Sequence, residues 1–167
     1  YMQFAPAPKN EHEPISALAG LHNLDTESDA RFDCLTKEEI RRFSVPISTI
    51  TLIDKDREWF KSVQGLKARE GKRDISFCGH ALLSQVVLII NDTLKDPRFA
   101  DNPMVKGEPF VRFYAGKSLF DYESKLPVGV FCIKDQKPRE ISVNDISDFL
   151  DLAERAEKEI NKKQISE

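Results

Sequence analysis

The stretch "ISTITLIDKDREWFKSVQG", residues 47–65, holds two runs of strand-forming residues around a polar turn. The first run is Ile47–Ile53 and the second is Glu58–Gln64, and both are rich in β-branched or aromatic side chains. The residues between them, Asp54–Arg57, are polar, as is typical of a connection between paired strands. The stretch therefore predicts a β-hairpin in the first half of the chain.

The other apolar patterns predict helices mostly near the two ends of the chain and strands between them. In chain order we expect helices from Ile15 and over about 28–43, the hairpin, a short helix at 76–84, the strand "VVLIIND", an irregular loop over 92–111, strands at 112–120 and 126–135, and a helix capped by Ser142. Strands that bunch as hairpins between terminal helices are typical of an α+β fold with an antiparallel sheet.

The last predicted strand is apolar on both of its faces. Val128, Val130 and Cys132 lie on one face, and Phe131 and Ile133 lie on the other. Because a sheet with one wet face alternates between apolar and polar residues, this pattern predicts a sheet that is covered on both sides. The terminal helices can cover one side, and the short helix and the long loop remain for the other.

The composition is that of an ordinary soluble globular protein. With 167 residues and a net charge of −3, the chain has the length of one domain and no bulk attraction to nucleic acid or anionic lipid. The longest aliphatic run, Val86–Ile90, is too short to span a bilayer. Three irregularly spaced cysteines argue against a disulfide framework and favour a reducing, cytoplasmic setting.

The segment "DISFCGHALL", Asp74–Leu83, raises the question of whether Cys78 and His80 carry chemistry. On a helix capped by Ser76 they would point about 200° apart, whereas shared metal ligands on a helix stand three or four residues apart. The plainest interpretation is a small buried Cys78 and a hydrogen-bonded His80 at the boundary of the core. A reactive Cys78 is the alternative, since a helix N-terminus lowers a thiol pKa, although burial opposes that shift.

Several other residues are open to two interpretations. Arg112 and Lys117 could neutralise an anionic ligand or form a solvated strand end. Gly116 and Gly129, inside predicted strands, could admit a ligand or a neighbouring side chain. A pocket could be lined, or a core filled, by the aromatic residues Trp59, Phe60, Phe99, Phe110, Phe113 and Tyr114.

Taken together, the motifs resemble a GAF domain of the bacterial sub-type that precedes diguanylate cyclase or histidine kinase modules. The resemblance runs from about Ile15 to Ala156 and is carried by "LHNLDTESDARFDCLT", "VPISTITLIDKDREWFKSVQGL", "RDISFCGHAL", "NDTLKDPRFADNPMV", "VRFYAGKSL" and "GVFCIKD". It implies a central antiparallel sheet of five or six strands, terminal helices on one face and a ligand pocket on the other, beneath the short helix and the long loop. Lys134 departs from the pattern, because an apolar residue is usual before the aspartate.

The resemblance implies a sensory module that is not an enzyme, with no catalytic residue and no metal. Neither the bilin-attaching context nor the full cyclic-nucleotide signature is matched, so the ligand and any cofactor stay unknown. From their grouping on the expected roof and facing strand, we predict that a small molecule contacts the side chains of His80, Phe99, Arg112 and Tyr114. Bulky side chains filling the pocket would instead favour a ligand-free dimerisation or spacer domain, and a thiol-dependent sulfoxide reductase is a third alternative.

The last helix predicts how a signal would leave the domain. Its apolar stripe comprises Ile146, Leu150, Ala153, Ala156 and Ile160. Packing on the domain's own sheet explains the stripe at least as well as a coiled coil does. We nevertheless expect a parallel homodimer through this helix and an output kinase or cyclase module. The expected organisation is a flexible arm or vector-derived remnant at 1–14, the GAF domain at 15–160, and the start of a linker helix at 161–167.

Overall fold

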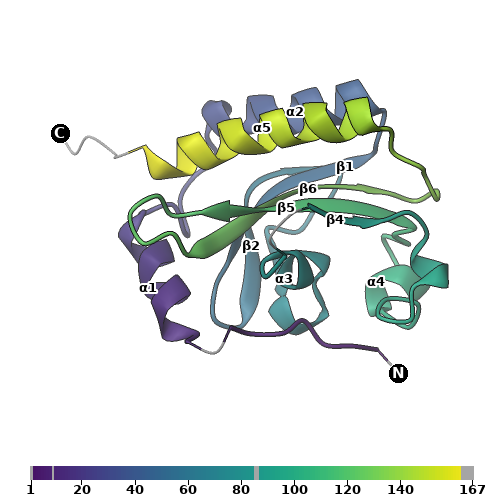
Figure 1. The fold of residues 1–167 in the computed structure, drawn as a ribbon, viewed down its shortest axis with the longest axis horizontal. Helices are drawn as coiled ribbons and strands as arrows, with labels where there is room; N and C mark the ends of the chain where they lie inside the picture. The colour runs from purple at the N-terminus through teal and green to yellow at the C-terminus, as the bar shows by residue number, and fades with distance from the viewer. Residues whose placement is uncertain (1, 9, 85–86, 163–167) are drawn as a thin grey trace.

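A computed structural model describes residues 2–8, 10–84 and 87–162, and its centre is a six-stranded antiparallel sheet (Figure 1). The strand order is β3-β2-β1-β6-β5-β4. The strands are β1 (Ile47–Ile53), β2 (Arg57–Gln64), β3 (Glu70–Lys72), β4 (Val87–Ile90), β5 (Phe113–Phe120) and β6 (Pro127–Asp135). The helices are α1 (His12–Gly20), α2 (Ala30–Phe43), α3 (Phe77–Ala81), α4 (Pro103–Lys106) and α5 (Val143–Asn161), with 3₁₀ turns η1 (Arg73–Ile75) and η2 (Thr93–Lys95). The predicted α+β fold class is confirmed.

The hairpin of β1 and β2 supplies the middle of the sheet. β1 pairs with β2 on one side and with β6 on the other, and all seven of its residues are buried. Leu52 lies opposite Trp59, and Ile53 lies opposite Glu58. Arg57, at the start of β2, holds the turn by an ion pair to Asp54 at 3.0 Å.

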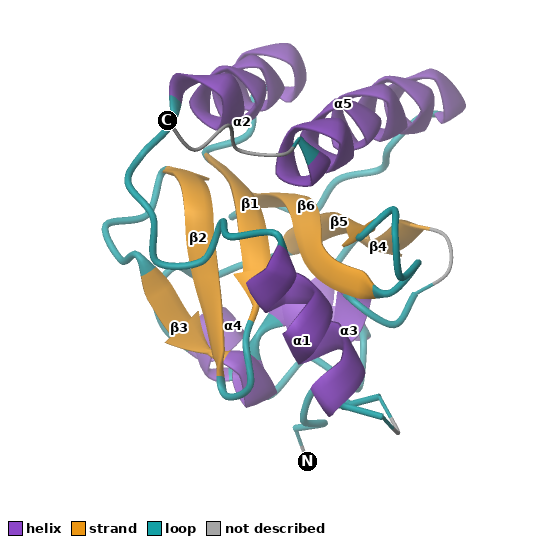
Figure 2. Cartoon of the chain, turned by 90° about the vertical axis from the view of Figure 1, so that its left-hand side faces the viewer, coloured by secondary structure: helices purple, strands orange, loops and turns teal. Residues whose placement is uncertain are grey.

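One face of the sheet is covered by α2 and α5, which lie side by side above it (Figures 1 and 2). Each helix begins with a side-chain cap: Asp29 accepts from the backbone N–H of Arg31, and Ser142 forms a capping box with Asp145. The apolar faces of both helices pack with Ile50, Leu52 and other inward residues of the sheet into one core. Ala153, Ala156 and Ile160 of the α5 stripe are buried there, whereas residues 163–167 of the predicted linker helix lie outside the described residues.

α1 lies at one end of the sheet, where Leu18 reaches the same core (Figure 2). The helix begins at His12, so the boundary that we predicted at Ile15 falls inside it. Residues 2–8 run along the side of the molecule opposite α2 and α5 (Figure 1). There, Ala5 donates a backbone hydrogen bond to the Asp74 carbonyl at 2.9 Å. This part of the predicted arm therefore packs against the residues that lead into α3.

The opposite face of the sheet is covered by a roof, defined here as α3 together with residues 92–111. Ser76 caps α3, because its hydroxyl accepts a hydrogen bond from the Gly79 backbone N–H at 2.8 Å. The helix ends at Ala81, three residues short of the predicted end. Roof and sheet enclose a second core, so the predicted burial of both faces is confirmed. No helix in the described ranges has the length and apolarity needed to cross a membrane.

A buried acid on α2 makes the stability of this fold depend on pH. The side chain of Glu39 is fully buried, and within the described residues both of its carboxyl oxygens lack a hydrogen-bond partner. Burial raises the pKa of Glu39 from 4.5 to about 8. Between these two pKa values the folded state therefore carries the protonated acid, whereas the unfolded chain carries the ionised one.

We expect the free energy of unfolding to fall as pH rises from 4.5 to 8, the window between the two pKa values of Glu39. The variant Glu39→Gln removes this contribution and should flatten the slope by up to about 1.4 kcal/mol per pH unit. Urea unfolding of the wild type, Glu39→Gln and the exposed control Glu13→Gln across that range measures it. Equal slopes for Glu39→Gln and the wild type would contradict the assignment.

Candidate functional site

The space beneath the roof is occupied by a stack of aromatic side chains. The rings of Phe77 and Phe99 lie 4.6 Å apart at 8° to each other, and Phe77 also stacks on Tyr114 at 5.2 Å. His80 meets the edge of Phe99 at 4.7 Å. Phe77, His80, Phe99 and Tyr114 form what we call the aromatic cluster. Three of the four predicted ligand-binding residues therefore lie together, but they contact one another in a packed core.

Arg112, the fourth predicted residue, has a different environment. Its guanidinium donates hydrogen bonds to the backbone carbonyls of Val105 at 2.8 Å and Val111 at 3.3 Å. It thereby ties the end of the roof segment to the start of β5. Binding of a ligand by His80, Phe99, Arg112 and Tyr114 stays a prediction.

The two glycines inside the strands make room for neighbouring groups of the protein. A Cβ on Gly116 would lie 2.2 Å from the Tyr114 hydroxyl, and a Cβ on Gly129 would lie 2.6 Å from the Thr51 carbonyl oxygen. The ring of Tyr114 consequently lies over Gly116 and directs its hydroxyl to the Cys78 sulfur at 3.2 Å. Of the two interpretations given above, the neighbouring side chain is the one observed for Gly116.

A polar layer lies on the sheet beneath the aromatic cluster. Lys134 is 1% exposed, and its ammonium is 5.9 Å from the Phe77 ring centroid. Glu58 is 2% exposed, burial raises its pKa to about 8, and its Oε1 has no hydrogen-bond partner among the described residues. Burial lowers the pKa of Lys134, but the neighbouring Cys132, Glu58 and Cys78 leave it above its usual value.

The sequence carried a signal for this layer. Lys134 was visible as a departure from the family pattern, and its even position places it on the same face of β6 as Cys132 and Val130. The burial of Glu58 had no such signal, because a glutamate at a strand start next to a turn usually faces solvent.

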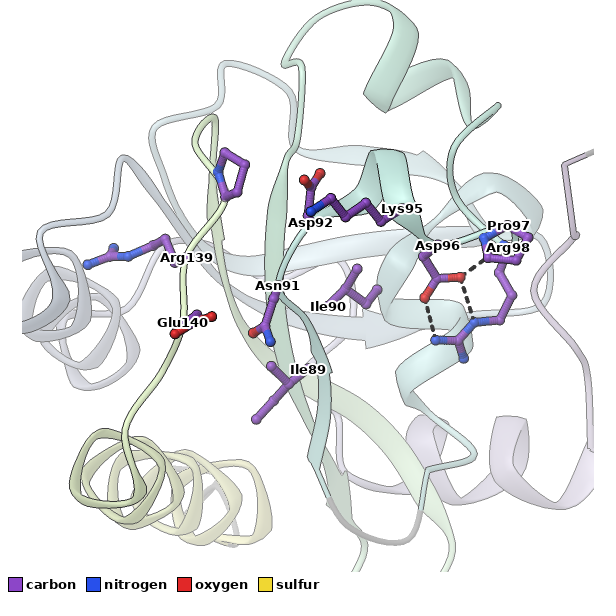
Figure 3. Close-up of a pocket in the computed structure, with 11 residues that line it drawn as sticks. Ile89, Ile90, Asn91, Asp92, Lys95, Asp96, Pro97, Arg98, Arg139 and Glu140 are labelled. Carbon is purple, nitrogen blue, oxygen red and sulfur yellow. Dashed lines mark hydrogen bonds and ion pairs between the residues drawn. The ribbon is translucent and has the colours of Figure 1, made fainter.

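A hollow of ligand size lies at the β4 edge of the sheet, between the start of the roof and residues 138–140 (Figure 3). We call it the groove; it encloses about 690 Å³, within the range of small-molecule sites. It is lined by Ile89, Ile90, Asn91, Asp92, Lys95, Asp96, Pro97, Arg98, Pro138, Arg139 and Glu140. None of the four predicted ligand-binding residues lines it.

The groove has two walls that are far apart in the sequence. One wall is the end of β4 with residues 91–98, and the other is 138–140, the segment that leads into α5. The Arg139 N–H donates to the Asn91 carbonyl at 3.0 Å and joins the walls. The sequence did not predict this site because, although residues 91–98 lie in a motif that carries the family resemblance, no pattern in the sequence pairs them with residues 138–140.

The groove is lined by equal numbers of acidic and basic side chains, and some of them have no partner among the described residues. Arg98 makes an ion pair with Asp96 at 2.7 Å and lies over the Phe99 ring, 5.2 Å from its centroid. The ion pair with Arg98 lowers the pKa of Asp96 and keeps it ionised. Within the described part of the chain, no hydrogen bond or ion pair engages the side chains of Lys95 and Glu140. These groups are available to a polar molecule of small size.

The described ranges contain no group of side chains that is suited to bind a metal ion. There, no three side chains of histidine, cysteine, aspartate or glutamate are grouped so that they could hold a metal ion.

The chain matches the GAF domain family over residues 18–160, and it therefore belongs to that family. It is 38% identical over 138 residues to a cyclic di-GMP phosphodiesterase of Pseudomonas aeruginosa. That match covers 83% of this chain but only 23% of the relative, so the chain spans less than a quarter of the relative's length.

Solved structures share the fold at low sequence identity. The GAF domain of an Acinetobacter phosphoenolpyruvate-protein phosphotransferase is similar with a TM-score of 0.61 and 14% identity, over 89% of this chain and 92% of that one. A domain of a putative two-component sensor histidine kinase from Sinorhizobium meliloti gives 0.61 and 15%, over 77% and 87%. A free methionine-R-sulfoxide reductase from Neisseria meningitidis gives 0.62 and 18%, over 96% of both chains.

The aromatic cluster should hold the roof on the sheet. Phe99 is fully buried, so Phe99→Ala should lower the free energy of unfolding by about 3–5 kcal/mol. Phe110, in the same loop, is 42% exposed, and Phe110→Ala is the matched control with little expected change. Chemical denaturation of both variants tests this. A loss below about 1 kcal/mol for Phe99→Ala would show that the roof is only loosely attached.

Proposed function

We propose that this GAF domain is a sensory module that binds a small polar molecule in the groove and passes the signal to α5. The observation that supports it is the position of residues 138–140. They form one wall of the groove and end two residues before Ser142, the cap of α5. A molecule that contacts both walls would change the position of the segment that starts the C-terminal helix.

The cap makes this segment a suitable relay. Ser142 and Asp145 bond each other's backbone N–H groups, which fixes the direction in which the chain enters α5. A shift at 138–140 therefore moves the start of the helix as a unit. Such a molecule would regulate only if it bound one arrangement of 138–140 more tightly than another.

The domain would act within a larger protein. The relative that is 38% identical is a cyclic di-GMP phosphodiesterase, and the match covers 23% of it. We propose by analogy that this chain is the sensing part of a bacterial cyclic di-GMP or two-component protein. In that arrangement a homodimer through the terminal helices would carry the signal to the output module. The role is regulatory and includes no catalytic step.

Native mass spectrometry of the purified domain, incubated with a small-molecule extract of the expressing cells, tests ligand binding directly. We expect a bound mass in the wild type and in the control Lys55→Ala, whose exposed lysine lies in the β1–β2 turn. The double variant Asn91→Ala/Lys95→Ala removes two polar side chains of the groove and should lose that mass. The same spectra report the fraction of dimer.

Hydrogen exchange then tests the route of the signal. Addition of the extract should change amide exchange in residues 138–146 of the wild type and leave the double variant unchanged. A bound mass that survives in the double variant would place the ligand elsewhere. Binding without any change over 138–146 would contradict the relay through α5.

A second candidate is a ligand-free dimerisation or spacer domain. The observation that favours it is the aromatic cluster, because Phe77 and Tyr114 fill the space where the family resemblance placed a pocket. This candidate expects a dimer and no bound mass in the same spectra. The sulfoxide reductase alternative expects thiol-dependent turnover of free methionine sulfoxide that is lost in Cys78→Ser, whereas the regulatory proposal expects none.

A further inference from the structure

Two buried thiols face each other across the boundary between roof and sheet. Cys78 is on α3, Cys132 is on β6, and both are 0% exposed. Both side chains belong to the same core cluster, and each is close enough to shift the pKa of the other. Neither takes part in the groove or in the proposed relay to α5.

A chain of hydrogen bonds connects the same two thiols through threonine hydroxyls. The Cys132 sulfur is 2.9 Å from the Thr49 hydroxyl, which is 2.6 Å from the Thr51 hydroxyl. The Thr51 hydroxyl is 3.7 Å from the Cys78 sulfur, and Tyr114 donates to that sulfur at 3.2 Å. The thiols thus lie among polar groups that can stabilise a sulfur anion and can accept or supply its proton.

The interaction between the two thiols makes them unequal, because it raises the pKa of Cys78 and lowers that of Cys132. Burial raises the pKa of Cys78 well above its usual value. Burial acts in the same direction on Cys132, but its bond to Cys78 and the charge of Lys134 bring the pKa of Cys132 down to about 7. Cys132 therefore has the larger thiolate fraction at neutral pH, and the thiolate is the nucleophile.

We propose that Cys132 and Cys78 are a peroxide-sensitive pair that forms a disulfide between the sheet and the roof. The Cys132 thiolate attacks one oxygen of hydrogen peroxide, which breaks the O–O bond, gives a sulfenic acid at Cys132 and releases hydroxide. The Cys78 sulfur then attacks the Cys132 sulfur and forms the S–S bond. The Cys78 proton and the sulfenic hydroxyl leave as water, so two thiols are oxidised and one peroxide is reduced.

The bond would fix the roof in its packed position. α3 is five residues long and rests on the sheet through side-chain contacts, which the disulfide would supplement with a covalent link. Because both sulfurs are buried, peroxide reaches them only when α3 opens locally. The rate of disulfide formation would therefore depend on how often the roof opens.

Intact mass spectrometry and peptide mapping of the peroxide-treated domain test the proposal in the wild-type chain. We expect a loss of two hydrogen atoms per chain, a linked peptide pair containing Cys78 and Cys132, and reversal by dithiothreitol. The third cysteine, Cys34, is exposed, and Cys34→Ser removes its intermolecular disulfides without touching the pair. Oxidation confined to Cys34, or no linked pair in Cys34→Ser, would overturn the proposal.

Variants assign the two roles. In Cys34→Ser/Cys78→Ser the sulfenic acid at Cys132 has no partner and should be trapped by dimedone. Lys134→Met should slow disulfide formation several-fold near pH 7, because it removes a positive charge that lowers the pKa of the Cys132 thiol. Lys117→Met, which alters a half-buried lysine on neighbouring β5, should leave the rate unchanged. Equal rates in the two lysine variants, with circular dichroism showing both folded, would remove Lys134 from the mechanism.

Discussion

Burial of β1 on both of its faces is the constraint on which the rest of the structure depends. Its seven residues alternate between two cores: Ile50 and Leu52 face the terminal helices, and Thr49 and Thr51 face the roof. A strand in this position leaves no polar group in contact with water, so each hydroxyl needs a partner inside the protein. The Thr49–Thr51 hydrogen bond and the contacts of these hydroxyls with Cys132 and Cys78 answer that need.

The two cores differ in chemistry because of this alternation. The core beneath α2 and α5 consists of apolar side chains packed by burial of area, with Glu39 of α2 as a buried acid at the helix face. The core beneath the roof mixes the aromatic cluster with Lys134, Glu58 and two thiols. Buried charges stabilise little by themselves, since removing them from water costs more than a distant partner returns. The grouping of Lys134, Glu58 and two thiols beneath the roof is a reason to look for function there and at the adjoining groove.

Local sequence patterns predicted the elements well, because each depends on neighbours in the chain. The β1–β2 hairpin follows from the polar turn at Asp54–Arg57, and the start of α3 follows from Ser76 as its cap. The burial of both sheet faces was readable from 126–135 alone. The end of α3 was not, because residues 82–84 stay compatible with a helix and only packing beneath the roof decides where it stops.

The candidate site was less predictable, because its residues meet only in three dimensions. Sequence spacing placed His80, Phe99 and Tyr114 on roof and strand correctly, but it could not show that their rings would stack on Phe77 and fill the space between them. The groove depends on a contact between residues 91 and 139, which belong to segments with no shared motif. Polarity identifies candidates for a pocket, whereas side-chain direction decides whether a pocket remains.

Arg139 connects the groove to the helix core. Its backbone forms part of the groove wall and bonds Asn91, while its side chain pairs with Asp135 at 3.3 Å and lies over Phe113. Phe113 and Phe149 of α5 belong to the same core. Displacement of the wall would therefore disturb contacts of Arg139 with Asp135 and with Phe113. Since close-packed cores rearrange between discrete states and do not deform smoothly, the proposed relay would require a small movement at residue 139 to select between two positions of the C-terminal helix.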